Sequence, residues 1–343
     1  MFKHTCYSIL FGIILSACIK DKPQVVSSQA VNLSNASKIL IVNEGNFMSS
    51  NASVSLYDPG SGSVIEDYYK NQNGTSLGDV AQSMYYFNGN YYTVVNNSGK
   101  IMVCNRDFKL TSTINGFTSP RYILPVSNGK AYVSELYGNQ IKIVNLNTNQ
   151  ITGGIICPGW TEKMVKAYHK VFITNPQKNY CYVINSISDE KTDSVFVGIN
   201  AASIVVDAND KIWVLSSGDL ANSIAPLISR INPISLEIEL AYAMAMSDRP
   251  TELCLNKNKD TLYYLNKGIC KMSIQSNSTP SSPFISGGNR NYYGLNIDPH
   301  SNVIYVSDVL DYIQKSNVYL FDVNGNEKKF FKAGIIANSF YFE

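Results

Sequence analysis

Large aromatic and cationic side chains stand between the apolar segments of this chain, where loops are expected. Flat aromatic surface with neutral hydrogen-bond donors suits a large, polar ligand that is uncharged or zwitterionic, because stacking gives contact at little cost in side-chain entropy. For each residue, packing between neighbouring elements is the alternative interpretation. We expect the ligand-binding residues to be Phe47, Arg121, Tyr137, Trp160, Arg249, Tyr292, Tyr293 and Tyr312. A wider set of polar residues in the same kind of segment includes Glu135, Glu162, Asp219 and Arg290.

Three side chains with oxygen atoms are the candidates for a metal site. Glu44, Asn175 and Asp308 each follow an apolar segment that is expected to be a strand, so they could converge on a common axis. Carboxylate and amide oxygens suit Ca²⁺ or Mg²⁺, and such an ion could serve a metal-dependent enzyme by polarising a substrate carbonyl. This enzyme is the alternative to our main interpretation, which is binding without catalysis and without a resident cofactor or metal.

Other catalytic chemistry has little support. His169 and His300 have no Ser or Cys nucleophile motif beside them, so a hydrolase triad is not indicated. The sequence contains no GxGxxG phrase, so nucleotide chemistry is not indicated either.

The N-terminus has the pattern of a secretory signal. Lys3 and His4 precede an apolar run, 7–15, which is too short to span a membrane as a helix. The following phrase Leu-Ser-Ala-Cys, ending at Cys18, resembles the bacterial lipobox. We therefore predict a signal peptide over 1–17, lipidation of Cys18 and a flexible, Ser- and Asn-rich tether over 18–37. An ordinary signal peptide with an incidental Cys is the alternative.

The remaining cysteines do not form a recognisable framework. They are odd in number and no CxxC pair occurs, which argues against zinc and against a set of disulfides. We predict buried free thiols on strands. The residues concerned are Cys104, Cys157, Cys181, Cys254 and Cys270.

Composition limits the class of protein. The 343 residues carry 28 Lys and Arg against 26 Asp and Glu, a net charge of +2 that excludes a nucleic-acid binder driven by phosphate attraction. The chain has 23 Tyr, 22 Gly and many Asn and β-branched residues, a mixture that favours an all-β fold.

The elements that position the candidate residues repeat along the chain. A strand ending in Asp or Asn recurs every 40 to 47 residues, as at 54–58, 101–105 and 141–145, and a second apolar strand precedes it. Four strands in a period of about 40 to 45 residues are typical of a β-propeller blade. We predict a seven-bladed propeller over 38–343, with six or eight blades as the alternative.

The blade boundaries follow from the same repeat. Blade 1 is expected to combine outer strands from 38–69 with an inner strand at 337–342, which would leave no sheet edge open. The long loops 216–226 and 307–317 are either binding loops or plain insertions. Blades 2 to 7 are expected near 83–114, 120–156, 160–197, 202–244, 250–285 and 291–333.

The phrase at 204–215, Ile-Val-Val-Asp-Ala-Asn-Asp-Lys-Ile-Trp-Val-Leu, resembles the YncE-like, NHL and surface-layer propellers. With the lipobox, the segment 38–47 resembles propeller lipoproteins of Bacteroidota, including the BtuG-like cobalamin-capturing ones. The resemblance implies an outer-membrane, surface-facing lipoprotein that captures a ligand, such as cobalamin or another corrinoid, for a TonB-dependent transporter. It also implies a ligand face built from the loops between blades and between the second and third strands of each blade. The metal-dependent alternative resembles the senescence-marker propellers, a resemblance that implies a lactonase with Glu44, Asn175 and Asp308 as the metal ligands. A non-catalytic adhesion or scaffold role is a further alternative.

Overall fold

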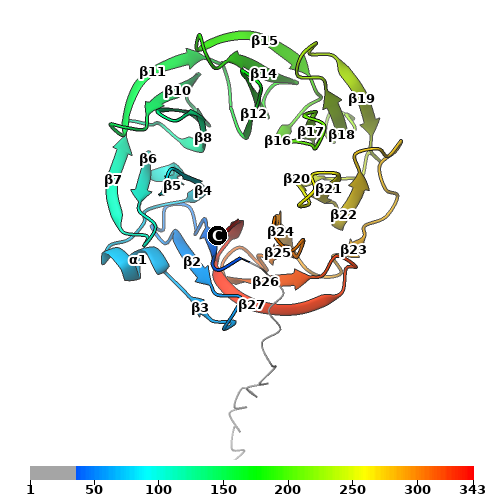
Figure 1. Cartoon of the computed structure of the whole chain (residues 1–343). Helices are drawn as coiled ribbons and strands as arrows, with labels where there is room; N and C mark the ends of the chain where they lie inside the picture. Colours follow the sequence, from blue (N-terminus) through cyan, green and yellow to red (C-terminus); the bar gives the residue numbers. More distant parts are fainter. Residues whose placement is uncertain (1–35) are drawn as a thin grey trace, which may run out of the picture. The chain divides into compact units, whose positions relative to one another are not determined.

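The computed structural model of the protein describes residues 36–343. These residues form seven four-stranded antiparallel sheets arranged around one axis, as Figure 1 shows. The predicted seven-bladed propeller is therefore confirmed. The predicted signal peptide, Cys18 and nearly all of the tether lie outside the described residues. Within 36–343, no helix is long and apolar enough to cross a membrane.

Blades 2 to 4 follow one another along the chain, each from its inner to its outer strand. Blade 2 contains β4 (Ala81–Phe87), β5 (Asn90–Val95), β6 (Lys100–Cys104) and β7 (Leu110–Asn115). Blade 3 contains β8 (Pro120–Ser127), β9 (Lys130–Glu135), β10 (Gln140–Asn145) and β11 (Gln150–Ile156). Blade 4 contains β12 (Met164–Ala167), β13 (Lys170–Thr174), β14 (Tyr180–Asn185) and β15 (Glu190–Phe196).

Blades 5 to 7 repeat this order. Blade 5 contains β16 (Ala201–Val206), β17 (Ile212–Ser216), β18 (Leu227–Ile231) and β19 (Ile238–Ala243). Blade 6 contains β20 (Thr251–Leu255), β21 (Thr261–Leu265), β22 (Gly268–Ser273) and β23 (Ile285–Ser286). Blade 7 contains β24 (Tyr292–Ile297), β25 (Ile304–Asp308), β26 (Lys315–Phe321) and β27 (Glu327–Ile335). The observed boundaries agree with the predicted ones to within a few residues.

Blade 1 joins the two ends of the described chain. Its order from the axis outward is β28 (Ala337–Phe342), β1 (Ile39–Asn43), β2 (Ser53–Tyr57) and β3 (Val64–Ile65). β1 and β28 pair antiparallel with Ile39 opposite Phe342, and the Ser37 amide donates to the Glu343 carbonyl at 2.6 Å. This is the predicted composite blade, in which β28 covers the inner edge of β1 and so closes the ring.

The outer part of blade 1 differs from the prediction. β3 ends at Ile65, and the short helix α1 (Tyr68–Asn73) follows where further strand was expected. Tyr68 and Tyr69 are buried against Phe108, with ring centroids 5.3 and 6.3 Å from it. The aromatic pair favours a strand by propensity, but a helical turn buries both rings against one neighbour, so packing decides the local structure.

The hydrophobic core lies between the blades. Each of the seven clusters of buried side chains joins two neighbouring blades, as where Val94 of β5 packs with Ile123 and Val133 of blade 3. Second strands such as β17, which is buried along its whole length, are apolar on both faces because both faces contact a neighbour. Outer strands such as β15 are largely exposed. The side chains that line the axis therefore come from the inner strands of the sheets.

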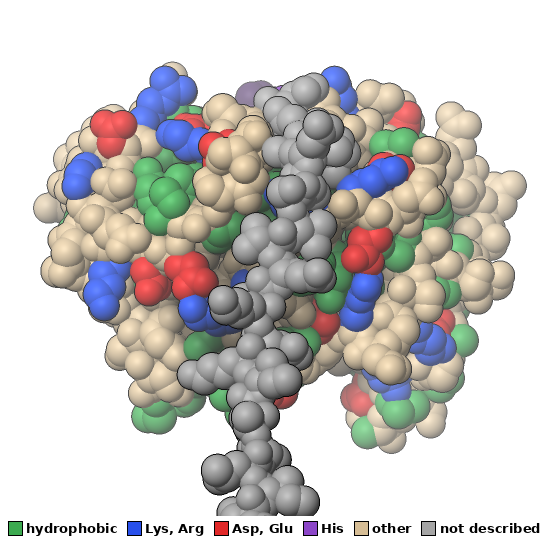
Figure 2. All heavy atoms as spheres, turned by 90° about the horizontal axis from the view of Figure 1, so that it is seen from below, with side chains coloured by type: hydrophobic (Ala, Val, Ile, Leu, Met, Phe, Trp, Pro, Cys, Tyr) green, Lys and Arg blue, Asp and Glu red, His purple; other side chains and the backbone are tan. Residues whose placement is uncertain are grey.

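The remaining surface features agree with the composition. On the rim that Figure 2 shows, basic and acidic side chains are interspersed, as the net charge of +2 suggests.

The described cysteines are free, and four of the five are buried while Cys254 is half-buried. The predicted buried thiols are thus confirmed for Cys104, Cys157, Cys181 and Cys270, and burial raises the pKa of Cys104 to about 12.

Candidate functional site

The start of each inner strand sets the geometry of the axis. We call the face that carries the loops between blades, and the loops from the second to the third strand of each blade, the loop face. Register shifts interrupt the pairing of the inner strands at their loop-face end in blades 1, 2, 3, 5, 6 and 7. Such bulges redirect a side chain that would otherwise pack between blades. The residues at this position are Gln82, Arg121, Ala202, Glu252, Tyr293 and Asn338, with Glu162 at the equivalent place before β12.

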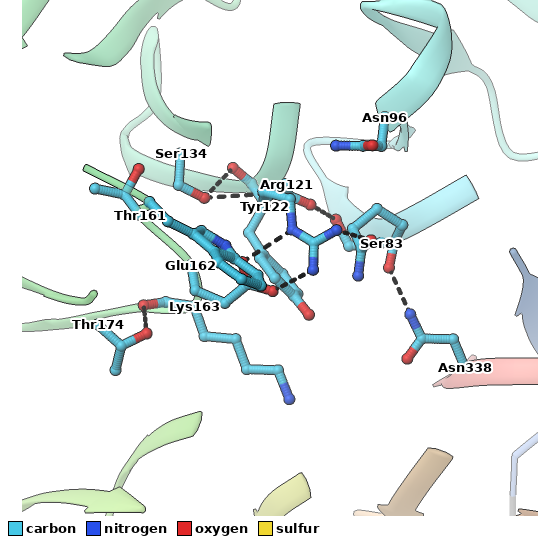
Figure 3. A network of polar contacts seen from close by, with 12 residues as sticks. Ser83, Asn96, Arg121, Tyr122, Ser134, Thr161, Glu162, Lys163, Thr174 and Asn338 are labelled. Carbon is cyan, nitrogen blue, oxygen red and sulfur yellow. Dashed lines mark hydrogen bonds and ion pairs between the residues drawn. The ribbon is translucent and has the colours of Figure 1, made fainter. Parts of the chain in front are cut away.

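An ion pair between blades 3 and 4 lies at the loop-face end of the axis. Arg121 donates from Nε and Nη2 to the two carboxylate oxygens of Glu162 at 2.9 and 2.6 Å (Figure 3). Its Nη1 donates to the side-chain oxygen of Gln82 in blade 2. Burial opposes the charge of Arg121, but Glu162 outweighs burial and raises the pKa of the guanidinium above its ordinary value. The pair is therefore a fixed, fully charged contact.

Trp160 is held against this pair. Its indole N–H donates to the Glu162 carboxylate, and the Arg121 guanidinium carbon lies 5.6 Å from the centre of its ring. A cation at this distance from an aromatic face is attracted to it. Trp160 is half-buried, and these contacts fix its orientation at the rim of the axis. We call Arg121, Glu162, Gln82 and Trp160 the axial mouth.

A second ion pair joins blades 4 and 6 at the axis. Lys163, from the segment before β12, donates to Glu252 of β20 at 2.7 Å, and its ammonium lies 5.9 Å from the centre of the Tyr122 ring. Burial opposes the charge of Lys163, but Glu252 outweighs it and raises the pKa of the ammonium. These residues line an axial cavity of about 340 Å³ to which the inner strands of the blades contribute, among them Asn296 and Asn338.

Glu44 and Tyr293 form a third polar contact on the loop face. Tyr293 donates its hydroxyl to Glu44 at 3.0 Å, and its ring meets that of Tyr312 edge-on with centroids 5.9 Å apart. Burial raises the pKa of Glu44 to about 7, although the hydrogen bond from Tyr293 and the charge of Arg121 oppose the rise. Glu44 is thus the carboxyl of this site that changes charge near neutral pH.

The structure separates the predicted ligand-binding residues into groups. Arg121 and Trp160 meet in the axial mouth, and Tyr293 packs on Tyr312 beside it. Arg121 is fully engaged by its neighbours. Phe47 and Tyr137 lie on separate loops and are exposed.

Arg249 and Tyr292 lie elsewhere on the loop face. They line a second cavity of about 390 Å³ between blades 6 and 7, together with Arg290.

Glu44, Asn175 and Asp308, the candidate metal ligands, each make hydrogen bonds within the loop face. The Asn175 side chain accepts the amide of Gln177 and donates to the carbonyl of Pro158, so it holds its own loops. Asp308 likewise accepts the amide of Asn291 at 2.9 Å. Residues that end a second strand cap the adjoining loops here, because the backbone amides of those loops need acceptors. Among residues 36–343, no group of three or more His, Cys, Asp or Glu side chains could hold a metal.

Sequence reasoning missed part of the axial network and one long loop. Gln82, Lys163, Glu252 and Asn338 were not singled out, because the strand pattern alone places them between blades. Aligning the repeats would have found Gln82, Glu252 and Asn338, since the position after Ala81, Thr251 and Ala337 is polar each time, but not Lys163. The loop 44–52 of blade 1 is also longer than the loop 309–314 of blade 7, which had been expected to be among the two longest.

Solved structures share this architecture at low sequence identity. A quinonprotein alcohol dehydrogenase-like protein from Bacteroides thetaiotaomicron superposes with a TM-score of 0.71 at 13% identity, covering 90% of this chain and 78% of that one. A functionally unknown protein from Desulfotomaculum acetoxidans gives 0.69 at 10% identity, covering 90% and 99%. A protein from Lactobacillus plantarum gives 0.67 at 10%, covering 90% and 99%. At such identities the likeness shows the fold alone.

Comparison of the sequence with family models identifies the family of the chain. No curated protein sequence matches the chain. The family described as a domain of unknown function, DUF5074, matches residues 38–342, which is the whole propeller apart from its last residue. The chain therefore belongs to the DUF5074 family of β-propeller proteins.

Proposed function

We propose that this protein is a lipid-anchored binding propeller that captures a ligand on its loop face and delivers it to a TonB-dependent outer-membrane transporter. The observation that carries the proposal is that more exposed large apolar side chains lie in loops of this face than in the turns of the opposite face, where Tyr168, Ile187, Ile234 and Val323 are exposed. Exposed apolar surface gathered on the rigid loops of a scaffold is typical of a binding site. The exposed fractions are 66% for Phe47, 79% for Met48, 74% for Tyr137, 58% for Leu220, 44% for Tyr312 and 70% for Ile313.

The axial mouth supports the same function. Trp160 is oriented by Glu162 and Arg121 before any ligand arrives, so a planar ligand would find a stacking surface that costs little entropy to order. The surrounding donors include amides and phenols. This combination suits a large ligand with planar, polar and nearly neutral surface, and a corrinoid such as cobalamin is the first candidate.

Calorimetric titration of the propeller, residues 30–343, with cyanocobalamin tests the capture step. We expect saturable binding that Tyr137→Ala and Trp160→Ala each weaken by about 1 to 3 kcal/mol, because each removes an aromatic contact. Tyr168→Ala is the matched control, since Tyr168 is 56% exposed in the turn between β12 and β13 on the opposite face. Equal weakening by the control variant, or no binding at tens of micromolar, would reject corrinoid capture on the loop face.

The anchor is tested separately in the full chain. Cys18→Ala should abolish incorporation of a fatty-acid analogue and release the protein from membranes, because acyl chains supply the membrane affinity. Incorporation that is unchanged by the substitution would reject lipidation at Cys18. Delivery is tested by uptake of labelled cobalamin in cells that carry only this variant, and we expect uptake to fall although the purified propeller still binds.

A further inference from the structure

The cavity between blades 6 and 7 owes its existence to a short turn. β21 ends at Leu265 and β22 begins at Gly268, so only Asn266 and Lys267 connect them, whereas blade 5 uses residues 217–226 at the same place. The short turn leaves a hollow of about 390 Å³ in the loop face.

Glycines line part of this hollow. Gly268, Gly287 and Gly288 contribute no side chain. A Cβ on Gly268 would lie 2.3 Å from the Ile285 carbonyl oxygen, so this position must remain glycine for the two loops to approach. A Cβ on Gly288 would meet no atom within 4 Å, which shows that this residue faces open space.

The lining is cationic. Arg249, Lys267 and Arg290 contribute to it, and no Asp or Glu does. Lys267 contacts Asp248 at 2.8 Å and Arg290 contacts Glu327 at 2.8 Å, and both of these acids lie outside the lining.

Arg249 is the uncompensated charge. It makes no ion pair within the part of the chain that the structure describes. Its Nη1 donates only to backbone carbonyls, at 2.9 Å to that of Met246, so the guanidinium is positioned but not neutralised. The cavity therefore carries a net positive charge.

Neutral hydrogen-bonding groups accompany this charge. The Tyr292 hydroxyl accepts from Arg290 Nη1 at 3.1 Å, so its own hydrogen is free to donate elsewhere, and the side chains of Asn266 and Asn291 also line the cavity. A guanidinium presents parallel N–H groups that match the oxygens of a phosphoryl or carboxylate group.

We propose that this cavity binds an oxyanion group, phosphoryl or carboxylate, through Arg249 with Lys267 and Tyr292 as further donors. The proposal does not depend on corrinoid capture, because it concerns a separate part of the loop face. It assigns the cavity to a charged group, whereas the aromatic loops present neutral surface. A ligand that carries both kinds of group could contact both regions.

Titration of the intact propeller with inorganic phosphate and, separately, with acetate tests the proposal, with chloride holding the ionic strength constant. We expect saturable binding of at least one anion. Arg249→Gln should weaken it about tenfold, since it removes a charge-assisted hydrogen bond. Arg249→Lys should weaken it less, because the charge remains while the planar fork is lost. The stronger-binding anion identifies the phosphoryl or the carboxylate group as the preferred partner.

Lys178→Gln is the matched control. Lys178 is an exposed lysine in the β13–β14 loop of the same face, so its removal changes the net charge equally without touching the cavity. We expect it to leave anion affinity unchanged. Equal weakening by Lys178→Gln and Arg249→Gln would show general electrostatic attraction, and an unchanged affinity of Arg249→Gln, or no binding of either anion at tens of millimolar, would also overturn the proposal. Unaltered thermal melting of each variant shows that folding is intact.

Discussion

The axial mouth and the cavity between blades 6 and 7 differ in how one arginine of each is partnered: Arg121 contacts a carboxylate, and Arg249 contacts backbone carbonyls. Arg121 and Glu162 are only 15% and 6% exposed at their side chains and satisfy each other with two hydrogen bonds. Arg249, on the exposed rim of the second cavity, has no acidic partner among the residues described. A charge that leaves water must be paired, whereas a charge that stays at the surface can remain open to a ligand. The comparison therefore distinguishes Arg121 and Glu162, which stabilise the structure of the loop face, from Arg249, which is available to bind a ligand.

Removal of the closing strand should have the largest effect on both regions. Deletion of residues 336–343 takes away β28, the inner strand of blade 1, and exposes the edge of β1. We expect aggregation or loss of cooperative melting, because β1 loses its pairing partner and blade 7 loses the side chains of β28 against which it packs. A truncated protein that melts like the intact one would show that the ring does not need this closure.

Breaking the buried pair should cost far more than breaking a surface pair. Glu162→Ala leaves Arg121 charged and without its carboxylate, and we expect a loss of about 3 to 5 kcal/mol in the free energy of unfolding. Glu327→Ala, which removes the partner of Arg290 at side-chain exposures of 31% and 39%, should cost about 1 kcal/mol or less. Denaturant titration measures both.

A double substitution sharpens the interpretation of that result. Arg121→Met combined with Glu162→Leu removes both charges together, so it should recover much of the stability lost in Glu162→Ala. A double variant as unstable as the single one would show that packing around the axial mouth, rather than the unpaired charge, accounts for the loss.

Glu44 should make the stability of the loop face depend on pH. The folded-state pKa is raised from 4.5 to about 7, so the folded protein binds a proton that the unfolded chain has already lost between these values. Stability from this group is complete below 4.5 and is lost as the pH rises through about 7, by at most about 1.4 kcal/mol for each pH unit. Thermal melting over this range should show the decline in the wild type and less of it in Glu44→Gln. An identical pH profile for the two proteins would contradict the raised pKa.

The exposed aromatics should have the smallest effect on stability. Phe47→Ala and Tyr137→Ala remove side chains that are largely exposed, so we expect changes in unfolding free energy within about 0.5 kcal/mol. A melting temperature well below that of the wild type would show that the ring of that residue packs against the protein and is not available to a ligand. Melting curves of the two variants decide this without any ligand.

Much of the fold could be predicted because it depends on local patterns. A strand such as β9 has a continuous apolar sequence where neighbouring blades cover both of its faces, and an alternating one where only one face is covered. Turns rich in Asn and Gly end the strands. Repetition of this pattern predicted blade 3 at 120–156, which is where β8 to β11 lie. The composite first blade followed from counting, since one inner strand was missing at the start and one strand remained at the end.

The site depended on contacts that no local pattern contains. Trp160 and Arg121 could be singled out as large side chains in loops, but only the closed ring shows that Glu162 engages both of them. Lys163 pairs with Glu252 from two blades away, and Glu44 meets Tyr293 across the closure of the ring.

The sequence by itself predicted the strands and their order, because these follow from hydrophobic period and turn chemistry between near neighbours. Repetition of the pattern then predicted seven blades and a first blade completed by the strand at 337–342. Tertiary structure alone decided which charges are neutralised and which remain open. The bulges that begin the inner strands turn side chains toward the axis, and the axial pairs Arg121–Glu162 and Lys163–Glu252 join residues of different blades, 41 and 89 positions apart in the chain.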